Sequence, residues 1–177
     1  MESPGWQIWR GNGYPGTRST PTINSGLVFA LGQFGDLVCV DAGSGKEHWR
    51  RSLFTDFRGK MMSDWGYAES PLVDGDKIVV TPGGPDGTIV ALNKNTGSVV
   101  WRTKDFKDNC AYCSMIVAQV AGQRQYIQLT DANVIGIAAS DGRVLWHASR
   151  PGQTAVIPTP IFYDDWRLRD VRVRSRV

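Results

Sequence analysis

The amino-acid sequence predicts an all-β protein, a partial β-propeller of about three four-stranded blades plus a partial fourth. Three observations support this prediction. Short runs rich in β-branched and aromatic residues alternate with turns of Gly, Asp and Asn, as in strands joined by hairpins. No segment shows a sustained helical period of apolar residues. One motif containing tryptophan occurs three times, at spacings of 52 and 45 residues, which is typical of propeller blades.

Each unit begins with a short opening segment in which a hydroxyl residue is always present and a proline follows it in three of the four copies. Proline is tolerated at the first residues of a strand, where no ladder donor is needed. A pair of strands follows, and a last strand carries the tryptophan, so each unit holds the four strands of one blade. The opening segments are 19–23, 69–73, 113–117 and 158–162, and the strand pairs are 27–31 with 36–40, 77–81 with 88–92, and 125–129 with 134–137.

The repeated motif is a tight turn followed by the strand with the tryptophan, and it spans 40–50, 92–102 and 137–147. An Asp or Asn eight residues before the tryptophan caps the turn through its side chain. A Gly four residues before the tryptophan supplies a positive φ. The tryptophan covers the neighbouring blade and buries a large area, with ligand stacking as its alternative role. These residues are Asp41, Gly45 and Trp49, then Asn93, Gly97 and Trp101, and finally Gly142 and Trp146.

These elements divide the chain into blades with additional segments at both ends. We interpret residues 1–16 as an N-terminal fragment, either the end of a preceding blade or the start of a mature protein with intervening blades lost. An open arc of three blades exposes two unpaired blade faces, so we expect the chain alone to be marginally stable and prone to self-association. The blades are 17–53, 66–104 and 111–149, the next begins over 154–165, and 166–177 is an atypical basic tail.

The charge of the chain is local to this tail. The whole sequence carries a formal net charge of +3, but five of its bases lie in residues 166–177, and the remainder has 15 bases and 16 acids. We therefore expect no nucleic-acid partner. No apolar run reaches the roughly 20 residues that a membrane span needs, and no signal peptide is visible at the start of the chain.

The cysteines do not form a disulfide framework, because there are only three of them. Cys110 and Cys113 have the C-x-x-C spacing of a redox pair or of half a zinc site. No second such pair occurs, and the two histidines are far away in sequence. We therefore interpret the cysteines as small, partly buried thiols and expect no catalytic, cofactor-binding or metal-binding residue among them.

The motif residues resemble the pyrroloquinoline-quinone-like (PQQ-like) β-propeller repeat family, whose signature is A-x-D-x-x-x-G-K-x-x-W. The best match is 38–49, and the resemblance covers about 17–165. Residues 65–76 and 81–84 look like the secreted bacterial branch related to the propeller lipoprotein of the outer-membrane β-barrel assembly machinery. The resemblance implies a parent propeller of eight blades and a periplasmic or extracytoplasmic location.

Two functions follow from this resemblance. The first is a non-catalytic module that acts as a protein-interaction scaffold, binds no cofactor, and has other proteins or further propeller blades as partners. The alternative is a fragment of a PQQ- and calcium-dependent quinoprotein dehydrogenase that oxidises alcohols or sugars. Such enzymes need a catalytic Asp, calcium ligands and a tryptophan platform, and many carry a disulfide between adjacent cysteines. No residue of this sequence matches those site motifs, so the scaffold is the preferred interpretation.

A candidate site comes from the geometry of propellers, in which the opening strands line the central channel. Arg18, Glu69 and Tyr112 lie at or just before the opening segments, so we expect them to ring one mouth of the channel. A carboxylate in such a place could bind a cation. The alternative for Glu69 is a solvated rim residue or a salt-bridge partner.

The tail admits two hypotheses. Codons exist for it that, read one base later, spell the family continuation Gly-Val-Phe-Val-Thr-Ser-Gly-Tyr-Gly-Ala-Gly, so the tail can be an out-of-frame translation of a gene that once continued. The structural alternative is a genuine edge strand, whose arginines between apolar residues blunt aggregation. Sequencing of the locus separates these hypotheses.

Overall fold

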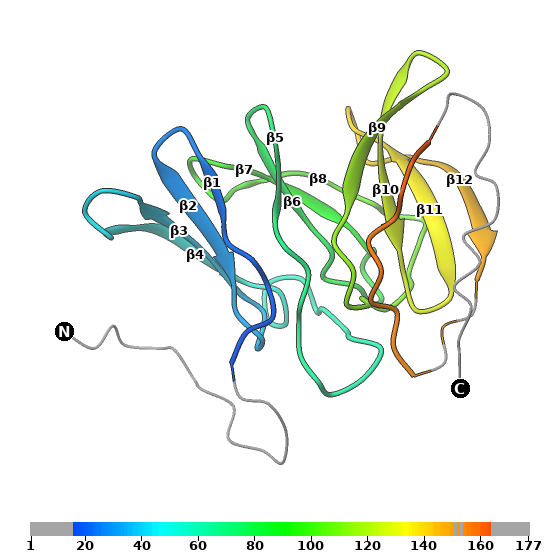
Figure 1. Ribbon diagram of the computed structural model, residues 1–177, viewed down its shortest axis with the longest axis horizontal. Coiled ribbons are helices and arrows are strands. Elements are labelled where there is room, and N and C mark those ends of the chain that lie inside the picture. Colours follow the sequence, from blue (N-terminus) through cyan, green and yellow to red (C-terminus); the bar gives the residue numbers. More distant parts are fainter. Residues whose placement is uncertain (1–15, 151, 153, 164–177) are drawn as a thin grey trace.

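The computed structural model describes residues 16–150, 152 and 154–163, and these parts contain strands β1 to β12 and no helix. The strands form three separate four-stranded antiparallel sheets, in each of which consecutive strands are neighbours. Figure 1 shows the sheets following one another as an open arc. The predicted all-β fold with three four-stranded units is therefore confirmed.

In each of the three sheets, a two-residue turn joins the first two strands. The first sheet contains β1 (Thr22–Asn24), β2 (Leu27–Leu31), β3 (Asp36–Asp41) and β4 (Glu47–Ser52). The second contains β5 (Leu72–Asp74), β6 (Lys77–Val80), β7 (Val90–Asn93) and β8 (Val99–Arg102). The third contains β9 (Ile116–Val120), β10 (Gln123–Leu129), β11 (Asn133–Ala138) and β12 (Val144–Ser149).

The last two strands of every sheet share an irregularity that the sequence did not reveal. Their register shifts at the same point, where the strand enters the motif turn. Such a bulge increases the local twist, so it turns the tryptophan-bearing strand in the same way in each sheet. The shifts lie between Cys39 and Val40, between Ala91 and Leu92, and between Gly136 and Ile137.

The apolar core lies between the sheets. Because successive side chains of a strand point to opposite faces, the second sheet contributes to two clusters. Ile78 and Val80 join Phe29 of the first sheet in one cluster, and Val79 joins Tyr126 of the third sheet in another. All four β6 and β10 side chains among these are at most 1% exposed. The middle sheet is thus covered on both faces by its neighbours.

A line of hydrogen bonds connects the opening segments of successive sheets. The Thr20 amide donates to the Ser70 hydroxyl (3.1 Å), and the Ser70 amide donates to the Ser114 hydroxyl (2.9 Å). Each hydroxyl thus accepts a bond from the sheet before it. This role explains why the sequence keeps a hydroxyl at this point of each unit, whereas Met115 replaces the proline.

The segment 154–163 follows the third sheet and lies against it. The Tyr112 amide donates to the Val156 carbonyl (2.9 Å), and Val156 and Phe162 pack on a cluster of third-sheet side chains. Figure 1 shows this segment in orange to red beside β9 and β10. The predicted opening strand over 158–162 is not formed in these described residues. An opening strand gains its ladder from the next strand of its own sheet, and no such partner lies within 154–163.

Two predicted segments fall largely or wholly outside the described residues. They are the N-terminal fragment 1–16, of which only Gly16 is described, and the tail 166–177. Within the described parts, no helix has the length and apolar character needed to cross a membrane.

Candidate functional site

Two of the three predicted mouth residues meet at Trp65, in the connection between the first and second sheets. The Arg18 guanidinium donates to the Trp65 carbonyl (3.1 Å), and the Trp65 ring stacks on Tyr112 with centroids 5.7 Å apart and an interplanar angle of 29°. The Tyr112 hydroxyl shares a hydrogen bond with Ser63. Burial raises the pKa of Tyr112, while the Ser63 bond and the Arg18 charge oppose that rise.

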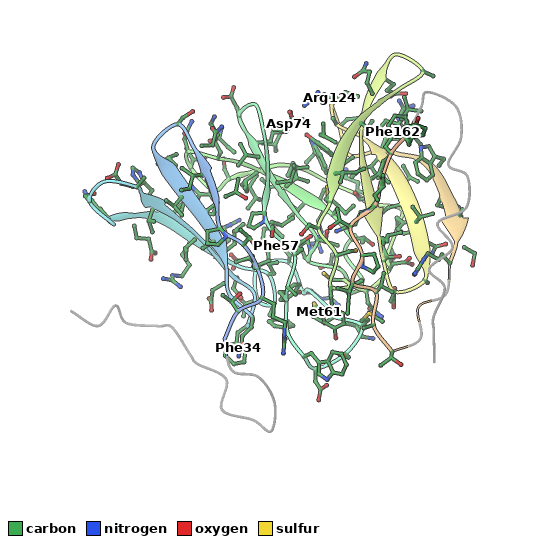
Figure 2. The ribbon with its side chains drawn as sticks, in the orientation of Figure 1. Phe34, Phe57, Met61, Asp74, Arg124 and Phe162 are labelled. Atoms are coloured by element: carbon green, nitrogen blue, oxygen red, sulfur yellow. The ribbon has the colours of Figure 1, made fainter. Side chains whose placement is uncertain are left out.

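Trp65 stands beside a shallow apolar hollow. The side chains of Phe34, Phe54 and Met61 contribute to its lining together with Trp65. Trp65 is 51% exposed and Phe54 is 41% exposed, so aromatic rings face the solvent here. Figure 2 shows Phe34 and Met61 toward the lower edge of the sheets, away from Asp74 and Arg124 at the upper edge. We name Phe34, Phe54, Met61, Trp65 and Tyr112 the aromatic surface.

Glu69 does not join this surface. Its side chain is enclosed between the second and third sheets, where the residue is 1% exposed. One carboxylate oxygen accepts the Thr81 amide hydrogen bond, and the other accepts from Gln128 Nε2 (3.2 Å). Burial raises the pKa of Glu69 to about 7, although the bonds from Thr81 oppose the rise. The interpretation of Glu69 as a solvated rim residue or salt-bridge partner is therefore wrong, since it meets neutral donors in a closed interface.

The amide of Gln128 holds this polar cluster together. Its Nε2 also donates to Thr81 Oγ1 (2.8 Å), and its Oε1 accepts from the Leu129 amide (3.0 Å). The Cys113 thiol points to the same Oε1 (3.4 Å) and to the Leu129 carbonyl (3.1 Å). Gln128 thus joins the second sheet to the third. The sequence carries no local signal for this role, because Glu69 and Gln128 are 59 residues apart.

The cysteines are free and fully buried. Burial raises the pKa of Cys113 to about 12 and that of Cys110 well above its ordinary value. A thiol that stays protonated is a poor nucleophile and a poor metal ligand. Both thiols are more deeply buried than the sequence predicted, and they pack in apolar clusters.

The motif residues lie at the joints between sheets. A Cβ on Gly97 would lie 2.8 Å from Cδ2 of Trp49, and a Cβ on Gly142 would lie 2.8 Å from Cδ2 of Trp101. Each of these two tryptophans therefore rests on the glycine turn of the next sheet. Trp49 also donates from Nε1 to the Lys94 carbonyl (2.9 Å). The third pair has a different environment, because Trp146 lies over Gly136 of its own sheet.

In the first two sheets, the predicted Asp and Asn side chains cap the motif turns. Asp41 Oδ1 accepts from the Ser44 amide (2.7 Å) and hydroxyl (2.6 Å), and these bonds lower the pKa of Asp41. Asn93 Oδ1 accepts from the amides that follow it in its turn. The glycines of the three turns, Gly45, Gly97 and Gly142, have φ of 70°, 69° and 75°.

A quinoprotein dehydrogenase requires side chains that could hold its calcium ion. Calcium takes six to eight oxygen ligands, whereas the described residues contain no group of three or more His, Cys, Asp or Glu side chains able to hold a metal. The enclosed carboxylate of Glu69 already accepts from protein donors at both oxygens. No two of the cysteines, Cys39, Cys110 and Cys113, are adjacent.

Comparisons with known proteins support both branches of the resemblance. The quinoprotein ethanol dehydrogenase of Pseudomonas aeruginosa is 34% identical over 103 residues, which cover 56% of this chain and 15% of that protein. The outer membrane protein assembly factor BamB of Salmonella typhimurium is 29% identical over 87 residues, which cover 49% of this chain and 19% of that protein. These matches span less than a fifth of each relative's length.

A solved structure shows the same fold. The quinohemoprotein alcohol dehydrogenase from Comamonas testosteroni aligns with a TM-score of 0.55 at 18% identity, covering 75% of this chain and 21% of that chain. A family model described as outer membrane protein assembly factor BamB matches residues 2–174. The predicted resemblance to PQQ-like repeats is thereby confirmed. With that match along nearly its whole length and with the repeated four-stranded sheets in place, the chain belongs to the PQQ_2 family of BamB-like propellers.

Proposed function

We propose that the chain is a non-catalytic PQQ-like β-propeller module that acts as a protein-interaction scaffold outside the cytoplasm. The observation that carries this proposal is the aromatic surface. Exposed aromatic rings beside an apolar hollow are typical of protein-binding sites, where aromatic residues are enriched. A partner would cover the exposed rings of Trp65 and Phe54, which are 51% and 41% exposed.

The aromatic surface is held in shape before any partner binds. Trp65 is fixed by the stack on Tyr112 and by the hydrogen bond from Arg18. An anchor ring whose position is already fixed loses less conformational entropy on binding. Buried tryptophan and tyrosine anchors provide much of the binding energy in protein interfaces. Trp65 is therefore the residue we assign as the main anchor.

Binding experiments with matched variants test the scaffold. The full chain and its Trp65→Ala variant serve as baits in a periplasmic extract, with quantitative mass spectrometry as the readout. A Val100→Ala variant, changed at a half-exposed residue of β8, is the control. We expect at least one protein to be enriched by the parent and by the control. Its enrichment should fall by about tenfold or more with Trp65→Ala, because the interface loses one anchor residue. Equal enrichment with all three baits would contradict the proposal.

A second candidate function is part of a PQQ- and calcium-dependent quinoprotein dehydrogenase acting on alcohols or sugars. The 34% identity with the Pseudomonas aeruginosa enzyme favours it, and the lack of a fitting ligand group in the described residues argues against it. Equilibrium dialysis with the quinone and calcium, followed by dye-linked oxidation of ethanol, tests it. Saturable quinone binding by the chain would favour the enzyme. We expect no cofactor to bind, and other proteins or further blades to be the partners.

The proposed scaffold consists of the blades 17–53, 66–104 and 111–149. The strands of the three sheets lie inside these ranges. The location outside the cytoplasm is supported by the relatives, one of which is named an outer membrane protein assembly factor. Fractionation of cells that express the parent gene tests the location.

A further inference from the structure

Neighbouring sheets contact each other in the same way, through a tryptophan of one sheet and a glycine turn of the next. Among the described residues, the glycine turn of the first sheet and the tryptophan of the third sheet lack such a partner. In both internal joints the tryptophan of one sheet rests on the bare glycine of the next, Trp49 on Gly97 and Trp101 on Gly142. Gly45 of the first sheet has no atom within 4 Å of the position where a Cβ would stand. Its turn is therefore an open seat for an indole ring.

Trp146 of the third sheet is the matching unused ring. It is half-buried, lies over Gly136 of its own sheet, and donates from Nε1 to Gln125 Oε1 (2.7 Å). In contrast, Trp49 and Trp101 are 9% and 8% exposed. Among the described residues, Trp146 thus lacks the following glycine turn that covers the other two.

The outer faces of the first and third sheets, beside Gly45 and Trp146, are both apolar. Val28 and Ala30 of the first sheet hold the register positions of Ile78 and Val80 in the second. The second-sheet pair is fully buried, whereas Val28 and Ala30 are only half-buried. The far face of the third sheet carries another apolar cluster, which includes Ile127, Leu129 and Val134 and is covered in the single chain by Val156 and Phe162.

We propose that these two faces bind each other between two copies of the chain, with Trp146 of one copy seated on Gly45 of the next. The interface would repeat the joint that occurs twice inside the chain. Because it joins two different faces, it is a head-to-tail contact. Two copies joined at both ends would have six blades, and propellers close with four to eight. This inference does not depend on the aromatic surface.

The segment that follows Val156 must move for this contact to form. Residues 158–163 occupy the place that the opening segment of the second copy would take. The two segments share the pattern of hydroxyl residue and proline, at Thr20 and at Thr159. The resident segment makes no strand ladder, and Ile161 and Tyr163 are each 82% exposed. Its displacement breaks no strand ladder but removes Phe162 from the third-sheet cluster, and Thr20 of the second copy can then accept from the Ser114 amide.

Sedimentation velocity of the full 177-residue chain over a range of concentrations tests the proposal. We expect a dimer to form as the concentration rises. Trp146→Ala removes the ring, and Gly45→Asn fills the seat with a residue that tolerates positive φ. Each variant should weaken self-association by about 30-fold or more, the effect of losing an interface anchor worth about 2 kcal/mol. Gly75→Asn, at another open positive-φ turn, is the matched control and should dimerise like the parent.

A mixing experiment establishes the head-to-tail geometry. Trp146→Ala retains an intact seat and Gly45→Asn retains an intact ring, so an equimolar mixture of the two holds one complete joint. We expect the mixture to form a dimer that neither variant forms alone. A parent chain that stays monomeric, variants that associate like the parent, or a mixture that stays monomeric would each overturn the proposal. Near-UV circular dichroism of each variant shows whether it keeps the fold.

Discussion

The stability of the protein should depend on pH through Glu69. Its carboxyl group has a pKa of about 7 in the folded chain because burial disfavours the charged form, against an ordinary value of 4.5. Between these values the folded state binds a proton that the unfolded state has lost, so the free energy of unfolding falls as the pH rises. The contribution is fully present below pH 4.5 and is lost above about pH 7.

The size of this effect follows from the two pKa values. Each unit of pKa difference corresponds to about 1.36 kcal/mol, so the rise from 4.5 to about 7 makes the folded state about 3 kcal/mol less stable at pH 8 than at pH 4. Glu69→Gln removes the ionisation. The variant should show no such decline. Its NH2 group replaces one acceptor oxygen among donors such as Gln128 Nε2, so its stability should be lower at every pH.

Urea denaturation at several pH values between 4 and 8 measures the decline. The control is Asp74→Asn, because the Arg124 bonds lower the pKa of Asp74. Asp74 therefore contributes stability that is present above pH 3.8 and lost as the pH falls through its lower folded pKa. That variant should retain the decline between pH 4.5 and 7. A parent chain with constant stability in this window, or an equal decline in Glu69→Gln, would refute the argument.

Three further predictions concern the joints and the aromatic surface. Trp101→Ala should lower the free energy of unfolding by about 3–5 kcal/mol in urea denaturation, because it empties the joint above Gly142. Asp41→Ala should lower the free energy of unfolding in the same assay by less than Trp101→Ala does, because it removes only the side-chain cap of a turn. Tyr112→Ala should release Trp65 from its stack. The fraction of tryptophan fluorescence that iodide quenches should then rise, and an unchanged fraction would argue against the stack.

The repeated pattern was sufficient to predict the sheets. Alternating apolar residues and glycine turns are local signals, so the strand Leu27–Leu31 was predicted to the residue, and each of the three motif tryptophans lies on the last strand of its sheet. The sequence also indicated that Arg18 and Tyr112 lie near one another, since both neighbour opening segments. In contrast, the place of Glu69 beside an opening segment did not predict its burial, since the residue is 1% exposed.

Glu69 shows the limit of that approach. Its position before an opening segment predicted a channel mouth, but its exposure depends on Gln128 of the next sheet. Sequence spacing carries no information on such a distant partner. The role of Trp65 was missed for the same reason, because its stacking partner lies in a different connection.

The hydroxyl line along the opening segments has a consequence for how such chains change in length. Each segment offers an amide to the sheet after it and a hydroxyl to the sheet before it, as Ser70 does. A donor and an acceptor therefore remain matched when a whole blade is excised or duplicated between equivalent residues. Removal of the middle blade would bring Thr20 to Ser114 with the same bond. The hydrogen bonds between opening segments thus form in the same way for any number of blades. Gene duplication can therefore add blades without any change to the residues of these segments.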